Sequence, residues 1–196
     1  MISRISNRIA QGLVQKNIIS EDETELFHYG LFVIFSELFA LIYCLLVGTV
    51  LKVIFVSVLF YVFFGILHRF AGGFHVKTEL CCQIITALFF LMGIAGTKFS
   101  VLIDSGYLMV ICAFSSLLLV ILSPADTPQK PIEPKERVMF KKIILITVVI
   151  GFVLVILLNL IGAYMYANTI VVAIVMQTIS VILGKLFNKN LLISKT

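Results

Sequence analysis

Six long and almost unbroken apolar stretches constrain what this 196-residue chain can fold into. A helix needs about 20 mainly apolar residues to cross a bilayer, with roughly 17 to 25 tolerated. The stretches cover residues 29–51, 53–67, 80–96, 99–122, 143–165 and 169–187, and the second is the shortest. Their hydrophobicity is continuous, whereas the strands of an outer-membrane barrel alternate between apolar and polar residues. The sequence therefore predicts an all-α integral membrane protein with about six transmembrane helices.

Composition excludes the other broad classes of protein. Hydrophobic residues make up 61% of the chain and charged residues 13%, and the mean hydropathy is +1.14. Soluble domains carry about 25% charged residues, so a soluble globule of this composition could not cover its surface. The chain contains only 12 Gly, 4 Pro and 4 Cys, which excludes a collagen-like chain, a disordered chain and a disulfide scaffold.

The distribution of Lys and Arg predicts how the spans are oriented. If the N-terminus is cytoplasmic, all but two of the 15 basic residues fall in cytoplasmic segments, the exceptions being Lys52 and Lys98. The positive-inside rule leads us to expect such a bias in short loops. We therefore predict a multi-pass membrane protein whose N- and C-termini are both cytoplasmic. The net charge of +5 then reflects membrane topology and does not indicate a surface for nucleic acid.

The chain before the first stretch is apolar on one side and polar on the other. Apolar residues recur at spacings of three and four and are interspersed with basic residues: Ile2, Ile5, Ile9 and Leu13 with Arg4, Arg8 and Lys16. This pattern predicts an amphipathic helix over residues 1–19 that lies on the inner leaflet, and not a cleavable signal peptide. Ser20 followed by Glu23 fits a capping box, which predicts that a new helix begins there and enters the first span.

We expect a single membrane-embedded domain over residues 1–196, without an internal repeat. Its only extended polar connection covers residues 123–142. In this Pro-rich loop the four prolines of the chain are expected to forbid a regular helix: Pro124, Pro128, Pro131 and Pro134. By the charge distribution the loop is cytoplasmic, and so is the segment over residues 68–82, between the second and third spans.

The segment over residues 68–82 gathers most of the reactive side chains. It contains His68 and His75, two of the three histidines, and Cys81 and Cys82, two of the four cysteines. A nucleophilic cysteine needs a nearby base and an electropositive setting to be present as the thiolate. Histidine is the side chain best able to act as that base near neutral pH. The segment is therefore the candidate site for nucleophilic catalysis.

Spacing limits the geometry of this site. His75 and Cys82 are seven residues apart, and one continuous helix would separate them by about 10 Å along its axis, beyond hydrogen-bond reach. The pair therefore needs a helix that begins between them. Thr78 is a candidate N-cap and would place Cys82 in the first turn, where free amides and the helix dipole favour a thiolate. Gly72 and Gly73 permit backbone angles that would let His75 turn back toward the sulfur.

On this reasoning Cys82 is the nucleophile and His75 the base. Cys81 stays open as an alternative nucleophile, although it points about 100° away around the helix. Packing and membrane topology also stay open as explanations, because cysteine is a common apolar filler and basic residues mark the inner ends of spans. A metal site that combines both cysteines with His68 and His75 is a weaker alternative, because adjacent cysteines are poorly spaced for zinc. We expect no metal and no cofactor.

The remaining cysteines and the polar residues inside the spans are weaker candidates. Cys44 and Cys112 are expected to pack in the interior, and the cytoplasmic position of the Cys81–Cys82 pair argues against a structural disulfide. Glu37 lies about 12 Å into the first span, where an acid is either structural or part of a site. Asn159 and Gln177 could form polar contacts between the last two spans. Asp104 is expected to mark an outer helix end, and Asp126 is expected to be a turn residue.

At the segment over residues 68–82 the chain resembles the accessory gene regulator protein B family, membrane peptidases of Gram-positive quorum sensing. Three features carry the resemblance: the sequence Arg-Phe-Ala-Gly-Gly-Phe-His at 69–75, a cysteine seven residues after that histidine, and Ser-Pro-Ala-Asp-Thr-Pro-Gln-Lys-Pro-Ile at 123–132. The length and the order of the hydrophobic segments agree as well. The resemblance implies a multi-pass protein of the bacterial cell membrane that acts as a homodimer.

The resemblance also implies that His75 and Cys82 form a catalytic dyad. The substrate would be a short propeptide with an amphipathic leader, a central cysteine or serine, and an acidic C-terminal tail. Cys82 would cleave the bond before the tail, and the acyl-enzyme thioester would close to a thiolactone or lactone. Water must be excluded, because thioester exchange is nearly balanced and hydrolysis would otherwise dominate.

Other roles at the site stay open. Arg69 and Lys77 could bind the acidic tail, or they could be topology charges only. Gly73 is expected to serve the backbone shape, and the oxyanion donors could be the first amides of the third span. Two rival functions remain: a small transporter or channel subunit, with Glu37, Asn159 and Gln177 lining a path, and a noncatalytic membrane scaffold.

Overall fold

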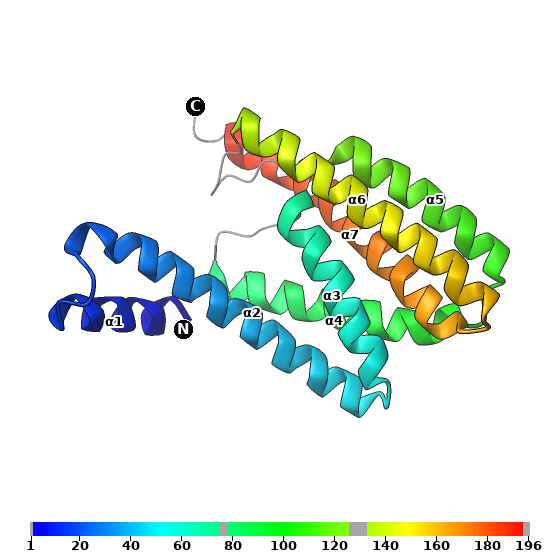
Figure 1. The fold of residues 1–196 in the computed structure, drawn as a ribbon, viewed down its shortest axis with the longest axis horizontal. Coiled ribbons are helices and arrows are strands. Elements are labelled where there is room, and N and C mark those ends of the chain that lie inside the picture. The colour runs from blue at the N-terminus through cyan, green and yellow to red at the C-terminus, as the bar shows by residue number, and fades with distance from the viewer. Residues whose placement is uncertain (1, 75–77, 126–132, 194–196) are drawn as a thin grey trace.

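The computed structural model describes residues 2–74, 78–125 and 133–193, and all regular secondary structure in these ranges is helical. The elements in chain order are α1 (Ile2–Gln15), η1 (Glu21–Glu23), α2 (Thr24–Val50), α3 (Ile54–Ala71), α4 (Glu79–Ser100), α5 (Ser105–Leu122), α6 (Pro134–Leu160) and α7 (Tyr164–Ile193) (Figure 1). In these ranges the six helices from α2 to α7 are long and apolar enough to cross a membrane. The predicted fold class, six spans after an N-terminal helix, is confirmed.

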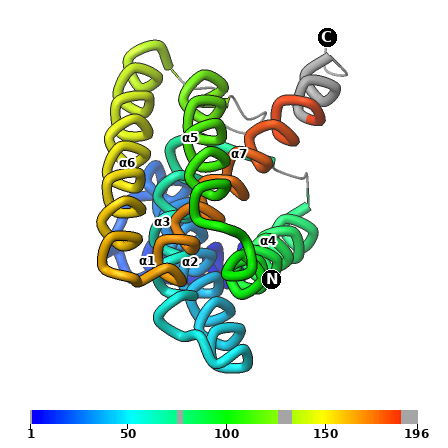
Figure 2. The backbone as a smooth tube through the Cα atoms, turned by 90° about the vertical axis from the view of Figure 1, so that its right-hand side faces the viewer, coloured from blue at the N-terminus to red at the C-terminus, as the bar shows by residue number. Residues whose placement is uncertain are grey.

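Helix α7 forms the centre of the bundle. It packs against α3, α4, α5 and α6, and Figure 2 shows it running among them. Many of its completely buried residues are small or β-branched: Ala167, Ile170, Val171, Ala173, Ile174 and Val181. Small side chains let helix backbones approach closely, which is how helices associate inside a membrane.

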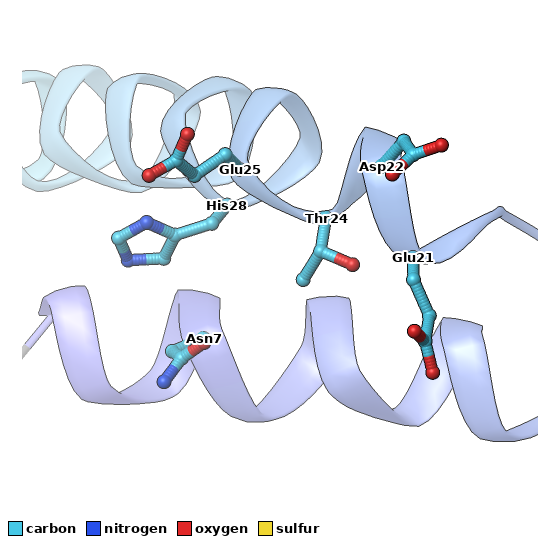
Figure 3. Close-up of a pocket in the computed structure, with 6 residues that line it drawn as sticks. All are labelled: Asn7, Glu21, Asp22, Thr24, Glu25 and His28. Atoms are coloured by element: carbon cyan, nitrogen blue, oxygen red, sulfur yellow. The ribbon is translucent and has the colours of Figure 1, made fainter.

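The first two helices form an antiparallel hairpin beside the bundle (Figure 1). At its tip the backbone N–H and the hydroxyl of Ser20 both donate to Glu23 Oε2, at 3.0 and 2.8 Å, so the predicted helix start is confirmed. A cavity of about 320 Å³ lies between the two helices, with His28 of α2 pointing toward α1 (Figure 3). Helix α1 buries Ser6 and Ala10, and it leaves Ile5 45% exposed. Its predicted contact with the inner leaflet remains a prediction.

The Pro-rich loop is shorter than predicted at its C-terminal end. Helix α6 begins at Pro134, after an extended Glu133 with φ −64° and ψ 151°, so residues 134–142 are helical. Proline at the first position of a helix loses no hydrogen bond, and its fixed φ suits the helix. The prediction that prolines prevent a helix up to residue 142 is therefore wrong, because Pro134 starts one.

The predicted boundary between the third and fourth spans, near residue 98, is also wrong. Helix α4 continues past Lys98, whose Nζ donates to the carbonyl oxygen of Leu51 at the end of α2, at 3.2 Å. A cation in the last turn of a helix is favourable for the helix dipole, so this lysine does not end the helix. Asp104 does mark a helix end, as predicted: it is the N-cap of α5, and its Oδ1 accepts a backbone N–H at 2.8 Å.

The last two spans meet at residues 161–163 and not at residues 166–168 as predicted. Gly162 adopts a φ of +76°, which favours glycine, and the Ala163 N–H donates to the Leu158 carbonyl oxygen at 2.8 Å. Asn168 and Thr169, predicted to lie at or beside the turn, are instead buried within the first half of α7. A glycine C-cap therefore outweighs a polar pair as the signal for a helix end.

Helix α3 is one turn longer than the predicted span and ends at Ala71, so His68 and Arg69 lie in its last turn. The last residue of α3 contacts the chain that follows α5: the Ala125 N–H donates to the Ala71 carbonyl oxygen at 2.9 Å. We call this end of the bundle, where α3 ends and α4 begins, the motif end. The described parts of the predicted cytoplasmic segment, residues 68–74 and 78–82, lie at this end.

Candidate active site

The start of α4 agrees with the geometry predicted for the nucleophile. Thr78 is the N-cap in an extended conformation, with φ −101° and ψ 133°, and the helix begins at Glu79. The Thr78 side chain makes no capping hydrogen bond. Its carbonyl oxygen accepts the Cys82 N–H at 3.0 Å, the first hydrogen bond of the helix. The amides of the three residues before Cys82 precede that bond and have no partner within the helix.

The two adjacent cysteines differ in exposure. Cys81 is exposed and Cys82 is half-buried, so the helix turns their side chains toward different surroundings. The other two cysteines, Cys44 and Cys112, are completely buried inside spans, as predicted. The Cys44 thiol donates to the Ser57 carbonyl oxygen at 3.0 Å, which is a packing role.

The first turn of α4 is attached to the N-terminal hairpin. The Ser3 N–H of α1 donates to Glu79 Oε1 at 3.2 Å. His28 of α2 lies on the other side of Ser3, with its Nε2 3.3 Å from the Ser3 carbonyl oxygen and 3.4 Å from Ser3 Oγ. Three helices thus meet three residues before Cys82.

The diglycine that follows α3 is held in one conformation. Gly72 has a φ of +71°, a backbone region that favours glycine. A Cβ on Gly72 would also lie 2.6 Å from the Ala125 carbonyl oxygen, so no larger residue fits there. A Cβ on Gly73 would lie 2.5 Å from Ser180 Oγ and 2.8 Å from His68 Cε1. Gly72 thus has the kind of backbone angle predicted for the diglycine, and close packing is a second reason for glycine at both positions.

Residues 72–74, which we call the strap, lie against the second half of α7. Gln177 Nε2 donates to the Gly72 carbonyl oxygen at 2.6 Å, and the Phe74 N–H donates to Ser180 Oγ at 3.3 Å. The Phe74 ring meets the Phe187 ring edge-on, with ring centroids 5.5 Å apart. The strap therefore leaves α3 along a fixed path beside α7.

This arrangement joins the two sequence motifs that are about 50 residues apart. Ala71 and Gly72 belong to the motif at 69–75, and Ala125 belongs to the motif that starts at Ser123. The hydrogen bond between Ala125 and Ala71 and the contact between Ala125 and Gly72 bring the two motifs together at the motif end.

The remaining predicted site residues are placed as follows. Arg69 is exposed in the last turn of α3. Glu37 accepts a hydrogen bond from the Tyr61 hydroxyl at 3.1 Å, and Tyr61 lies ten residues before Ala71, about 15 Å away along α3. The structure thus leaves Glu37 well away from the strap. His75 and Lys77 lie outside the described residues, as does Asp126.

The prediction that Gln177 makes a polar contact with the preceding span is wrong. Its side chain reaches α3 and the strap, not α6, and its Oε1 lies 3.2 Å from His68 Nδ1. Asn159 donates to Val155 in its own helix at 2.7 Å. Ser180 and Gly184 were not among the sequence candidates, although their spacing of three and seven residues from Gln177 was a usable signal in an otherwise apolar helix.

The described residues contain no group of three or more His, Cys, Asp or Glu side chains that could hold a metal ion.

Comparison with known proteins supports the family resemblance. The family model described as accessory gene regulator B matches residues 6–181. Two curated relatives from Clostridium perfringens are both named as putative AgrB-like proteins. The one from strain 13 is 25% identical over 145 residues, which are 70% of this chain and 67% of the relative. The one from strain SM101 is 21% identical over the same shares of both chains. No solved structure gives a significant match.

Proposed function

The chain belongs to the accessory gene regulator B family, and from that premise we propose that it is a cysteine endopeptidase that processes a quorum-sensing propeptide. The observation that carries the proposal is the position of Cys82. It is half-buried in the first turn of α4, in the same family-motif region whose earlier part, at Ala71, bonds to Ala125 of the second motif. A thiol at a helix N-terminus is the arrangement that favours a thiolate.

The reaction begins with proton transfer and attack. His75 takes the thiol proton, and the Cys82 sulfur attacks the carbonyl carbon of the peptide bond before the acidic tail. The carbon–nitrogen bond breaks, and the tail leaves as an amine that receives the proton from His75. The core of the propeptide remains on Cys82 as a thioester.

The second step closes a ring. A thiol or hydroxyl from the central cysteine or serine of the propeptide attacks the thioester carbon and gives up its proton. The Cys82 sulfur leaves and is protonated, and the product is a thiolactone or a lactone. The electrons and protons balance without a cofactor, and the step competes with hydrolysis only if water is excluded from the site.

The oxyanion that forms in each step needs donors. The backbone amides of Leu80 and Cys81 precede the first hydrogen bond of α4, and we propose them for this role. Gln83 adds a side-chain candidate, because its Nε2 is buried and has no hydrogen-bond partner in the part of the chain that the structure describes. Both groups of donors lie within one turn of Cys82.

Recognition of the tail is assigned to basic residues. Arg69 is exposed at the motif end, beside the start of the strap, and can pair with a carboxylate. We propose the same role for Lys77 and place the site at the cytoplasmic face, in a homodimeric membrane protein with cytoplasmic termini. Glu37 is the weakest of the proposed substrate contacts because it lies beside Tyr61, far from the strap.

The decisive experiment co-expresses the protein with a short propeptide that has a central cysteine and an acidic C-terminal tail, and follows release of that tail. Cys82→Ala and His75→Ala should each abolish cleavage, and Cys81→Ala should preserve it. Retention of cleavage in Cys82→Ala together with its loss in Cys81→Ala would reassign the nucleophile. A transport activity that stays intact in Cys82→Ala would instead favour a transporter, and a cellular function unaffected by both Cys82→Ala and His75→Ala would favour a noncatalytic scaffold.

A further inference from the structure

We infer that Gln177 is a positioning residue for the catalytic histidine: with Ser180 and Gly184 it makes one face of α7 into a seat for the strap that leads into His75. This inference rests on the proposed function. It assigns a role in the reaction to a helix that contributes no residue to either family motif.

Gln177 is completely buried, and both ends of its amide have a partner. Nε2 donates to the Gly72 carbonyl oxygen at 2.6 Å, and Oε1 lies 3.2 Å from His68 Nδ1. An amide oxygen can only accept, so Nδ1 of His68 carries the proton. Burying an amide in an apolar setting is costly unless it is hydrogen-bonded, and here the bonds go to α3 and to the strap. The residue thus ties the end of α3 to the strap.

The next two positions on the same face continue the contact. Ser180, three residues after Gln177, accepts the Phe74 N–H at 3.3 Å. Gly184, seven residues after Gln177, leaves room for the strap, because a Cβ there would lie 2.5 Å from the Gly73 carbonyl oxygen. Residues at these spacings share one face of a helix. This face of α7 therefore contacts all three strap residues, Gly72, Gly73 and Phe74.

The strap also contacts the second family motif. The Ala125 carbonyl oxygen is so close to Gly72 that a Cβ would lie 2.6 Å from it. The strap is thus held both by α7 and by the second family motif, and its contacts with α7 extend to Phe74, the residue before His75. A base must come within hydrogen-bond reach of its thiol, and small errors in placement slow the reaction strongly. These contacts fix the chain up to Phe74, the residue before His75, and we expect them to set where the proposed base is held.

A structural role for Gln177 makes a different prediction from a positioning role. Loss of a merely structural contact would lower the amount of folded protein and leave the chemistry of the remaining folded molecules unchanged. Loss of a positioning contact lowers kcat in folded protein and alters the pH dependence of the Cys82 thiol, because the imidazole beside it has moved.

The first test uses Gln177→Met in the full-length protein, because methionine keeps the length of the side chain and removes both hydrogen bonds. The matched control is Thr178→Val. Thr178 is the adjacent residue on α7, is also buried, and donates to the Ser115 carbonyl oxygen on α5 at 3.1 Å, away from the strap. We expect Gln177→Met to lower kcat for tail release at least tenfold with KM within twofold, and Thr178→Val to stay within twofold of the parent.

A second readout does not depend on propeptide cleavage. In a Cys81→Ala background, the rate of Cys82 alkylation by iodoacetamide is measured across pH. The midpoint of that profile should shift in Gln177→Met and remain at the parent value in Thr178→Val. Cys44 and Cys112 are buried and should contribute little to the signal.

Gly184→Ala keeps the test falsifiable if Gln177→Met folds poorly. Alanine favours a helix over glycine, so this change should not unfold α7, yet its methyl group would collide with the strap. Gly65→Ala on α3 is the matched control, because no atom lies within 4 Å of its new Cβ. We expect Gly184→Ala to lose at least tenfold in kcat and Gly65→Ala to keep the parent rate.

The outcomes separate the two proposals. If the parent cleaves the propeptide while Gln177→Met and Gly184→Ala match their controls in kcat and in the alkylation profile, the positioning role is overturned and the proposed function stands. If the parent cleaves nothing, the proposed function fails, and the positioning role fails with it.

Discussion

Helices α7 and α2 are almost equally apolar but occupy opposite environments. The 18-residue apolar stretches of these two spans have mean hydropathies of 2.2 and 2.4. Of the residues in these stretches, 50% are buried in α7 but only 11% in α2. Helix α2 exposes large side chains along its length, among them Leu38 and Leu46. Helix α7 instead buries alanine, serine, threonine and glutamine. Hydropathy therefore indicates that a helix crosses the membrane and says little about which neighbours it has.

The physical reason is that lipid tails are as apolar as leucine. Apolar residues gain little by exchanging lipid for another helix, so close packing and hydrogen bonds determine which helix becomes central. Helix α7 has the small residues that allow close approach and the polar residues that bond to neighbours. It thereby holds the strap, whereas α2 mainly faces outward and joins the hairpin with α1.

The largest difference between the two helices should appear when apolar side chains are truncated. Ile174→Ala on α7 removes a side chain with 0% exposure and should lower the free energy of unfolding by roughly 2–4 kcal/mol, because it leaves a cavity. Leu38→Ala on α2, where the side chain is 49% exposed, should cost less than about 1 kcal/mol. Unfolding in mixed micelles measures both. Equal losses would mean that α2 is covered by another chain or segment.

An intermediate effect is expected from two glycines in the spans. A Cβ on Gly93 of α4 would collide with the Phe60 ring of α3, so Gly93→Ala should destabilise the protein by about 1–3 kcal/mol. Gly30→Ala on α2 meets no atom within 4 Å and should stabilise the helix by up to about 1 kcal/mol. The sign of the change in unfolding free energy distinguishes the two sites. A loss at Gly30 would contradict the open face of α2.

The smallest effect is expected at the one polar contact between α2 and α3 that involves a carboxyl group. Tyr61→Phe removes the hydroxyl that donates to Glu37 Oε2, and such bonds inside membranes average about 0.6 kcal/mol.

Because Glu37 lies far from the strap, Glu37→Gln should change the KM for tail release less than Arg69→Gln does. A larger rise in KM for Glu37→Gln would make α2 part of the substrate path.

Local features of the chain were predictable wherever their causes lie within a few residues. The capping box at Ser20 and Glu23, the N-cap at Thr78 and the helix end at Asp104 all depend on short-range backbone chemistry. The wrong boundaries also have local causes. Lys98 suits a last turn, and Pro134 suits a first one.

The candidate site was only half predictable. The sequence places Cys82 in the first turn of α4 and requires glycine at Gly72, and the structure agrees with both. The partner of Gln177 was predicted wrongly, because a polar residue inside a span shows that a hydrogen bond is needed but not where its partner lies. The pairing of His75 with Cys82 stays a prediction.

The pattern of apolar runs, basic residues and helix caps already dictates a membrane protein of six spans with a cysteine in the first turn of one helix. These properties follow from transfer free energies and backbone hydrogen bonding, which act along the chain. The contact between Ala71 and Ala125 and the seat for the strap on α7 were decided only by packing. Inside a bilayer, apolar contrast cannot select which helix faces meet, so the shapes and hydrogen bonds of distant residues select them.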